Sequence, residues 1–452
     1  MHHDLSLKLL QHNQQVPRYT SFPTANHFSE TVKEADAKQW LAALGKETPL
    51  SLYFHIPFCK EICWYCGCHT KASKQYQPVT DFLAYLKKEV SLVAQHLKSK
   101  RKVAHIHFGG GSPSYLSPED FTSLMDHVAA HFDLQKEIEI AIEIDPRELT
   151  NLKAAAYRKA GVTRASLGVQ DFHEDVQRSI NRLQPGQTIY EAVQTLRDYQ
   201  INQINMDLLY GLPMQTTASV ERNIDMALGL NPSRISLFGY AHVPWMKKHM
   251  RLIDENTLPN GKDRLDQFGA AATALVRKGY VQIGLDHFVK PDDPMAMALR
   301  ARTLTRNFQG YSTDSAPAMI GFGPSAISDL PQGYTQNTLA NHTYFEVLDA
   351  GVLPIAKGIA VTKDDKIVRR LIAQLMCYME IDIDAFTSSE ALLPDYFSYA
   401  YDALRPLMQD KLISFKNGKI QVNKKVPQAV RLVCAAFDPY LNVCQKKHAQ
   451  IA

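Results

Sequence analysis

From residue 51 to residue 287, short apolar segments with strand-like spacing alternate with segments of helical spacing. Strands are expected at Ser51–Pro57, Val103–Phe108, Ile138–Ile144, Arg164–Val169, Ile204–Leu209, Arg234–Tyr240 and Tyr280–His287. Helices are expected between them, among others at Thr80–Lys98, Pro118–His131 and Asn151–Ala160. This alternation predicts an α/β fold in which a parallel sheet is joined by helical crossovers.

The predicted strands end in residues that are typical of functional sites. In chain order these are a cysteine-rich loop, Gly109-Gly110-Gly111, Glu143, Gln170, Asp207 and Ala241-His242. In a parallel barrel the carboxyl ends of the strands form one face, where sites are built. We therefore expect these residues to surround one opening.

The pattern changes on both sides of this region. Residues 1–50 are expected to form an ordered arm, since Val16–Thr24 holds two prolines and little periodicity. After residue 360, helices are expected at Asp364–Met379, Asp395–Asp410 and Val426–Phe437, with a hairpin that turns at Asn417-Gly418. The predicted organisation is an arm (1–50), a catalytic domain (51–360) and a smaller, mainly helical, winged-helix-like domain (361–452) that caps the substrate.

Composition limits the partners of the chain. Its 452 residues are 45% apolar and 21% charged, with a net charge of +4, which suits an anionic small substrate. The sequence lacks the dense basic stripe that would indicate nucleic-acid binding. No apolar run reaches the roughly 18 residues of a membrane span, and Met1–Gln15 lacks the features of a secretory signal. We expect a cytoplasmic monomer without a nucleic-acid partner.

Four of the seven cysteines, Cys59, Cys63, Cys66 and Cys68, lie within ten residues, whereas Cys377, Cys434 and Cys444 are scattered. In a reducing compartment such a cluster indicates metal binding rather than disulfides. Thiolates bind iron–sulfur clusters and zinc. Structural zinc sites usually use two separated ligand pairs, and no second pair follows at a suitable distance, so an iron–sulfur cluster is favoured. A structural zinc site and a four-cysteine electron-transfer cluster remain as alternatives.

The spacing of Cys59, Cys63 and Cys66 closely resembles that of the radical S-adenosylmethionine (SAM) superfamily. The resemblance implies that three thiolates hold three irons of a [4Fe–4S] cluster and leave the fourth iron to the amino and carboxylate groups of SAM. Electron transfer then breaks a carbon–sulfur bond and gives a 5′-deoxyadenosyl radical. Tyr65 matches the aromatic position near adenine, and Gly109–Pro113 matches the glycine-rich segment that meets the methionine amino group.

Further motifs narrow the resemblance to the oxygen-independent coproporphyrinogen III dehydrogenase (oxidase) family. They include Cys68, Pro17–Thr24, Gly168–Phe172, Asn205–Pro213, Tyr240–Pro244, Gly284–Phe288 and Asn307–Tyr311, so the match runs from about residue 15 to the end of the chain. The resemblance implies a partial (β/α)6-type barrel and the oxidative decarboxylation of two propionates of coproporphyrinogen III to vinyl groups, which gives protoporphyrinogen IX. It also implies two bound SAM molecules and a reducing electron donor such as a flavodoxin or ferredoxin.

Site residues are carried over from the family motif by motif. The expected contacts of the two SAM molecules are Tyr53, Tyr65, Gly110, Gly111, Ser112, Glu143, Gln170, Arg182, Asp207, Ala241 and Ile327. Arg182 is expected to pair with a methionine carboxylate. Cys68 is expected to act in catalysis near the substrate or the second SAM, because a fourth thiolate ligand would close the cluster. Arg18 and Met246–His249 are candidates for the substrate propionates.

The chain departs mildly from the family pattern at Ser112, Phe22 and Gly239, where threonine, tyrosine and asparagine are common. The alternatives are a haem-binding or haem-trafficking relative, a haem-degrading radical enzyme, and an electron carrier without catalytic activity. Trafficking relatives usually replace the fourth cysteine and lack the arm. Cys68 and Pro17–Thr24 therefore favour the enzyme.

Overall fold

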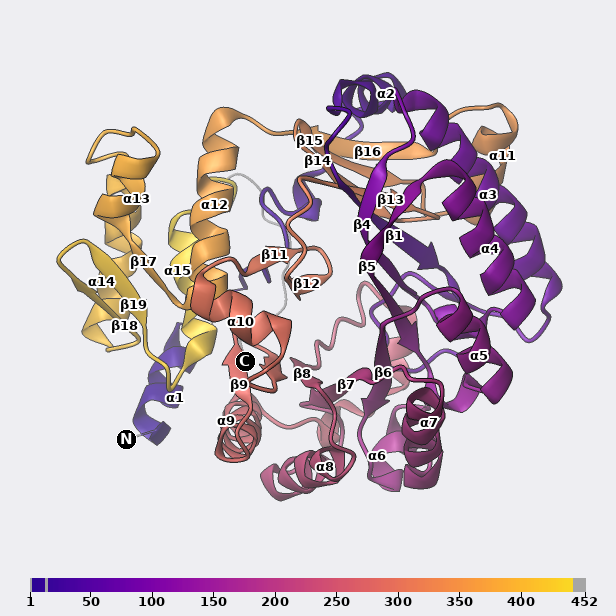
Figure 1. Cartoon of the computed structure of the whole chain (residues 1–452). Coiled ribbons are helices and arrows are strands. Elements are labelled where there is room, and N and C mark those ends of the chain that lie inside the picture. The colour runs from indigo at the N-terminus through magenta and orange to yellow at the C-terminus, as the bar shows by residue number, and fades with distance from the viewer. Residues whose placement is uncertain (1, 13–14, 442–452) are drawn as a thin grey trace.

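The computed structural model describes residues 2–12 and 15–441, so that Cys444 and the end of the predicted C-terminal domain lie outside the described residues. Figure 1 shows a curved sheet with helices along its outer side and, next to it, a smaller lobe formed by the last part of the chain. No described helix has the length and apolarity needed to cross a membrane.

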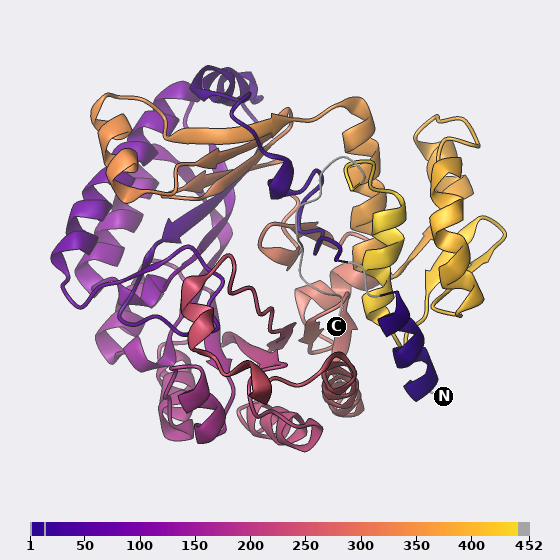
Figure 2. The same ribbon diagram turned by 180° about the vertical axis from the view of Figure 1, so that it is seen from behind.

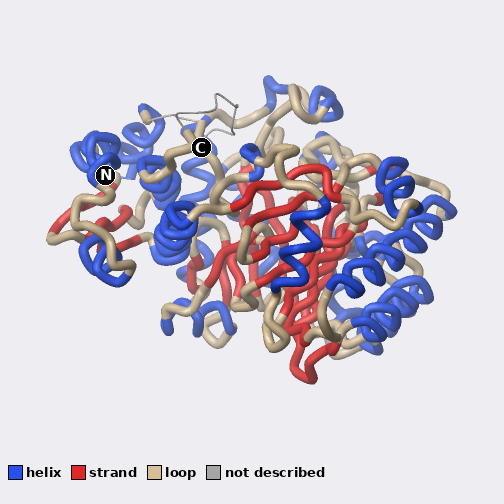
Figure 3. Tube along the Cα trace, turned by 90° about the horizontal axis from the view of Figure 1, so that it is seen from above, coloured by secondary structure: helices blue, strands red, loops and turns tan. Residues whose placement is uncertain are grey.

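Six neighbouring parallel strands form the centre of a twelve-stranded sheet. They are β1 (Leu50–Ile56), β4 (Lys102–Gly110), β5 (Asp133–Ile144), β6 (Arg164–Gln170), β7 (Gln203–Tyr210) and β8 (Arg234–Gly239). The connecting helices include α3 (Gln77–His96), α4 (Pro118–His131), α5 (Asn151–Lys159), α7 (Gly186–Asp198) and α8 (Thr217–Gly229). This succession confirms the predicted partial (β/α)6 barrel. Figure 3 shows the strands grouped together with most helices to either side.

The barrel stays open because further strands extend the sheet at both edges. On the β1 side, β13 is parallel and the next three strands are antiparallel. These four strands are β13 (Ala318–Phe322), β14 (Ile327–Leu330), β15 (Gly333–Asn337) and β16 (Ile355–Ala360), with α11 (Asn341–Asp349) before the last. This extension was not predicted, since its strands are short and β13, β14 and β15 follow one another without a helix between them.

The prediction of a seventh parallel strand at Tyr280–His287 was wrong. The segment forms a hairpin of β9 (Val281–Ile283) and β10 (His287–Val289), and β10 pairs antiparallel with β8. The chain reverses around Gly284, whose φ of +55° favours glycine. A Cβ atom there would also collide with the ring of Tyr311, so the backbone conformation and the side-chain packing both require glycine at this position.

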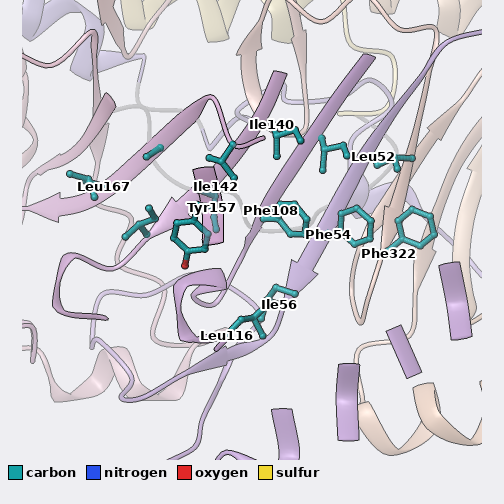
Figure 4. Close-up of a cluster of buried hydrophobic side chains, with 14 of the residues drawn as sticks. Leu52, Phe54, Ile56, Phe108, Leu116, Ile140, Ile142, Tyr157, Leu167 and Phe322 are labelled. Carbon is teal, nitrogen blue, oxygen red and sulfur yellow. The ribbon is translucent and has the colours of Figure 1, made fainter. Parts of the chain in front are cut away.

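Apolar side chains of the parallel strands point outward to the helices. Phe54 of β1 lies between Phe108 of β4 and Phe322 of β13, with 4.9 Å between ring centroids on each side. Figure 4 shows these rings in one row, with further aliphatic side chains of the strands beside them. Such burial is the main stabilising contribution to a sheet covered by helices. It holds the strand ends in a fixed arrangement.

The alternate side chains of the same strands point to the concave side and are mostly polar. They include Tyr53 and His55 of β1, His105 and His107 of β4, Glu139 and Glu143 of β5, Ser166 of β6, and Asn205 and Asp207 of β7. Because side chains alternate along a strand, the apolar residues between them fix which way these polar groups point. The barrel interior is therefore a polar cavity rather than a packed core.

The C-terminal lobe combines helices with a small sheet, as predicted. Its elements are α12 (Lys363–Tyr378), β17 (Glu380–Asp382), α13 (Ile383–Ser389), α14 (Tyr401–Gln409), β18 (Ile413–Lys416), β19 (Lys419–Val422) and α15 (Val430–Ala436). The predicted hairpin turns at Asn417 and Gly418, both with positive φ, as a type I′ turn requires. The helix expected from Asp395 begins only at Tyr401, after a short 3₁₀ turn.

The N-terminal segment joins this lobe to the barrel. Helix α1 (His2–Gln11) buries Leu5 and Leu9 in the same hydrophobic cluster as α12 and α15. Figures 1 and 2 show α1 beside the lobe. Val16–Thr24 forms neither helix nor strand, as predicted, and α2 (Glu34–Ala43) then leads to β1. Whether the three predicted parts are separate domains stays a prediction.

Candidate active site

The cysteine loop follows β1 and is closed at its base by a two-residue ladder. Strands β2 (Phe58–Cys59) and β3 (Lys71–Ala72) pair in parallel. Within the loop, the Cys66 N–H donates to the carbonyl of Cys63 at 3.1 Å, which makes a turn. All the loop's thiols are thereby held at the carboxyl end of β1.

A second loop packs under this one and depends on glycine. The Gly111 N–H donates to Ile56 O and the Ser112 N–H to Phe58 O, both at 2.8 Å. A Cβ atom on Gly110 would lie 2.8 Å from the ring of His55, and one on Gly111 would lie 2.7 Å from Phe58 O. Side chains are excluded at both positions. The glycine segment therefore reaches the cysteine loop, as the sequence predicts.

A cavity of about 250 Å³ lies between these loops and the strand ends. Twelve of the predicted site residues line it, namely Cys59, Cys63, Cys66, Cys68, Tyr65, Gly110, Gly111, Ser112, Glu143, Gln170, Arg182 and Asp207. They come from strands β2, β4, β5, β6 and β7, from the cysteine and glycine loops, and from the loop after α6 (Glu174–Ser179). The expectation that distant strand-end residues surround one opening is met for these twelve but not for Ala241 and His242, and we call this space the cysteine cavity.

One side of the cysteine cavity is cationic. The Arg182 guanidinium is buried and donates to Cys63 Sγ at 3.4 Å, Asp145 Oδ2 at 3.2 Å and Gly168 O at 2.7 Å. Arg147 donates two hydrogen bonds to the same carboxylate, from its Nε at 3.0 Å and from its Nη2 at 2.7 Å. Although burial acts to raise it, these two arginines hold the pKa of Asp145 at about 2. Two cations share one anion here, which leaves a positive excess.

The opposite side is acidic. Asp207 accepts from Ser166 Oγ and from Asn205 Nδ2, both at 2.8 Å, and burial raises the pKa of its carboxyl. Glu143 lies 3.2 Å from His107 Nε2, and its side chain is 43% exposed. A cavity with a positive end and an acidic end is complementary to a ligand that carries both an ammonium and a carboxylate group.

A larger cavity of about 530 Å³ adjoins the first. The predicted residues Tyr53 and Ile327 line it, and Cys68, Gly110 and Glu143 line both cavities. Tyr53 stacks on His107 at 5.8 Å and its hydroxyl lies 3.2 Å from His55 Nδ1. We call this space the second cavity. Cys68 stands at the boundary between the two.

Ala241 is the one predicted contact that lines neither cavity. It lies in the loop after β8, which instead reaches the backbone of the cysteine loop. Lys247 Nζ donates to Cys68 O at 2.8 Å, and His249 Nε2 lies 2.7 Å from Cys66 O. The predicted anion-binding segment Met246–His249 therefore holds two of the cysteine carbonyls.

Sequence reasoning missed Asp145, Arg147 and His107. The available signal for Asp145 and Arg147 was their position just after Glu143 at the end of β5, where Asp145 caps a short 3₁₀ turn. His107 alternates with apolar residues on β4, so its inward direction was readable from the strand period. Its contact with Glu143 on β5 depends on how the two strands align, which one strand alone does not specify.

The donor set fits an iron–sulfur cluster better than a single ion. Among residues 2–12 and 15–441, no group of three or more His, Cys, Asp and Glu side chains is arranged to hold one metal ion. A four-iron cluster does not need its thiolates to converge on one point, because each thiolate binds a different iron. Cys59, Cys63 and Cys66 line one cavity from one loop, beside glycine backbone that leaves room for the cluster and its ligand.

Comparison with known proteins supports this interpretation. Residues 53–227 match the family model of the Radical SAM superfamily. The oxygen-independent coproporphyrinogen III oxidase of Bradyrhizobium diazoefficiens is 44% identical over 437 residues, 97% of each chain. The oxidase of the same name from Helicobacter pylori is 36% identical, again over 97% of each chain.

A solved structure agrees with the chain in fold as well. The coproporphyrinogen III oxidase of Escherichia coli, a radical SAM enzyme, superposes with a TM-score of 0.89 at 37% identity. The match covers 94% of this chain and 100% of the other. Membership of this superfamily implies a [4Fe–4S] cluster and SAM. The chain belongs to the oxygen-independent coproporphyrinogen III oxidase family of radical SAM enzymes.

Proposed function

We propose that this chain catalyses the oxygen-independent oxidative decarboxylation of two propionates of coproporphyrinogen III, which gives protoporphyrinogen IX. The observation that carries the proposal is the cysteine cavity, in which three cysteines, a glycine segment, a cationic end and an acidic end come together in a chain with nearly full-length similarity to named oxidases. When bound, the [4Fe–4S] cluster and SAM supply the radical chemistry of this superfamily.

Different residues of the chain would bind the cluster and SAM. Cys59, Cys63 and Cys66 hold the cluster. Arg182, with Arg147 behind Asp145, attracts the methionine carboxylate, since their two charges are balanced by one acid. Glu143 and Asp207 accept hydrogen bonds from the ammonium group or the ribose hydroxyls. The small backbone at Gly110 and Gly111 leaves room for the methionine end.

The two-SAM stoichiometry belongs to the same proposal. The second cavity supports it, because its volume of about 530 Å³ adjoins the cysteine cavity and contains the carried-over residues Tyr53 and Ile327. Its wall is a mixture of aromatic, histidine and aliphatic groups, to which Glu143 adds a carboxylate. It can therefore receive a second SAM molecule or the edge of the tetrapyrrole.

Cys68 is assigned a catalytic role rather than a ligand role. It is exposed and lines both cavities, so its thiol faces the space where the two ligands meet.

Further parts of the proposal come from the family resemblance: a flavodoxin or ferredoxin as electron donor, a monomer, a cytoplasmic location and a substrate-capping role for the C-terminal lobe.

The proposal is tested with the reconstituted enzyme under strict anaerobiosis. Coproporphyrinogen III, SAM and a chemical reductant are added together, and porphyrins and 5′-deoxyadenosine are quantified. Protoporphyrinogen IX should form only when all three are present. SAM cleavage without any decarboxylated product would overturn the substrate assignment, and tight haem binding in place of turnover would favour the trafficking alternative.

A further inference from the structure

Four arginines from distant parts of the chain line a small cavity between the barrel, the arm and the C-terminal lobe. They are Arg18 of the arm, Arg264 of α9 (Gly261–Arg277), Arg306 of β11 (Thr305–Asn307) and Arg431 of α15. The cavity measures about 70 Å³, and we call it the arginine cavity. Because about 10–15 Å³ of such space holds one water, it accepts a carboxylate group but not a tetrapyrrole.

The charges around the arginine cavity do not balance. Its only lining carboxylate among the described residues is Asp286, which also lies 2.7 Å from the Nδ1 atom of His287. Burial, aided by the charge of Arg18, lowers the pKa of Arg431 to about 10. Burial also lowers the pKa of Arg264. Even with Arg431 left out of the count, the guanidinium groups of Arg18, Arg264 and Arg306 face one carboxylate, and this excess of positive charge is costly to bury without an anion.

Structural hydrogen bonds occupy part of these guanidinium groups. Arg306 Nε donates to Tyr19 O at 3.2 Å, and Arg431 Nε donates to Pro17 O at 3.1 Å. These two hydrogen bonds hold the N-terminal arm against the rest of the chain. Arg264 Nη2 donates to Tyr240 O at 2.6 Å and Arg18 Nη2 to Gly239 O at 3.2 Å. These acceptors are neutral carbonyl oxygens. They hold Arg18, Arg264 and Arg306 in place without neutralising their charges.

Two buried donors in this group have no partner. Arg264 Nε and Arg306 Nη1 are both enclosed and make no hydrogen bond within the chain. A buried N–H without an acceptor is costly, and guanidinium groups pair best with carboxylates. The charge excess and the unpaired donors are independent observations, and both call for an anion.

The arginine cavity also lies next to the reaction space. Phe238, at the end of β8, lines the arginine cavity, the cysteine cavity and a third cavity in the barrel interior. A carboxylate on a short side chain would reach the arginines while the body of its molecule stays in the barrel. Gly239 keeps this space open, since a Cβ atom there would lie 2.9 Å from Tyr210 Oη and 3.3 Å from Arg264 Nη2.

We propose that the arginine cavity binds one propionate carboxylate of coproporphyrinogen III, a propionate other than the one being decarboxylated. This inference rests on the proposed function, which provides the substrate. Binding there would fix the tetrapyrrole relative to the cysteine cavity. It would also couple substrate binding to the arm and the C-terminal lobe, because both contribute an arginine.

The test is equilibrium dialysis of coproporphyrinogen III against the cluster-loaded enzyme, kept anaerobic and without reductant. R264Q is expected to raise the Kd about tenfold or more, as loss of a charge-assisted hydrogen bond does. R18Q removes a charge from an exposed position and should raise the Kd several-fold without loss of fold. Arg405→Gln on α14, an exposed arginine that pairs with the neighbouring Asp402 and lines none of these cavities, is the matched control.

The same preparations are assayed for iron content, thermal unfolding and SAM binding, which should match those of the parent enzyme. The parent's turnover is measured in parallel, so that failure of the proposed function is seen separately. An unchanged Kd in R18Q and in folded R264Q, with a parent that converts coproporphyrinogen III, would overturn the inference and leave these arginines a purely structural role.

Discussion

At the scale of single residues, Cys68 differs from the other thiols of its loop in what surrounds it. Cys63 is buried and receives a hydrogen bond from Arg182, and Cys59 lies 3.2 Å from Thr70 Oγ1. Cys68 is exposed and borders both cavities. Under the proposed function, this difference separates the cysteines expected to hold a cluster from Cys68, which is expected to face the bound molecules.

Substitution of the cysteines should reveal these two roles. Cys59→Ala, Cys63→Ala and Cys66→Ala should each lose most of the bound iron and sulfide after anaerobic reconstitution, because three thiolates are the minimum that holds the cluster. Cys68→Ala should retain iron and the spectrum of the reduced cluster but lose product formation. Iron loss in Cys68→Ala equal to that in Cys59→Ala would contradict the assignment.

Arg147, which sequence reasoning missed, is expected under the proposed function to contribute to SAM binding. Arg147→Gln removes one of two cations that share Asp145, so the attraction for a carboxylate falls and the Kd of SAM should rise about tenfold. Isothermal titration of the cluster-loaded enzyme measures this. Arg158→Gln, on the exposed side of α5, is the control and should bind SAM like the parent. Equal affinity in both variants would remove Arg147 from the site.

At the scale of elements, a buried carboxyl group ties α3 to the strands that extend the barrel. Glu89 is 1% exposed and accepts from Gly323 N and Asn337 Nδ2 at 2.7 Å and from Tyr344 Oη at 2.6 Å. Gly323 begins the turn that leads to Ile327 in the second cavity. Burial raises the pKa of Glu89 to about 7 despite these three hydrogen bonds.

This shift predicts how stability depends on pH. The folded-state pKa of Glu89 lies above the ordinary value of 4.5, so its contribution is fully present below 4.5 and is lost as pH rises through about 7. The loss is on the order of 3 kcal/mol in the free energy of unfolding. Urea unfolding at about pH 5 and about pH 8.5 should show a smaller difference in Glu89→Gln than in the parent. Identical differences would contradict the shift.

Local pattern predicted the parallel strands well, because apolar and polar residues alternate along each one and helices separate them. The cysteine and glycine loops could also be placed, since the carboxyl ends of parallel strands share one face. Two kinds of feature could not be predicted. The reversal at Gly284 depends on the ring of Tyr311, which is distant in sequence. The Asp145–Arg182 pair depends on two loops meeting after folding.

At the scale of the whole molecule, the N-terminal segment packs against the C-terminal lobe. Tyr19 Oη donates to Asp438 at 3.0 Å, and Arg431 donates to the carbonyl groups of Val16 and Pro17. Residues more than 400 positions apart thus lie together beside the barrel. Nothing in the local sequence pattern of either segment indicates this contact, which arises from tertiary packing.

Packing of α1 on the lobe can be tested with two leucines of the same helix. Leu9 is fully buried, so Leu9→Ala should destabilise the lobe by about 2–5 kcal/mol and raise hydrogen exchange in α12 and α15. Leu7 is 42% exposed, and Leu7→Ala should leave exchange unchanged. Equal exchange in the two variants would show that α1 does not stabilise the lobe.

The most direct measurement of the central claim follows one hydrogen atom. Coproporphyrinogen III that carries deuterium on the propionate β-carbons is given to the reduced, cluster-loaded enzyme with SAM, and 5′-deoxyadenosine is analysed by mass spectrometry. The account predicts deuterated 5′-deoxyadenosine together with protoporphyrinogen IX. Formation of protoporphyrinogen IX with unlabelled 5′-deoxyadenosine, or SAM cleavage with the substrate left intact, would contradict it.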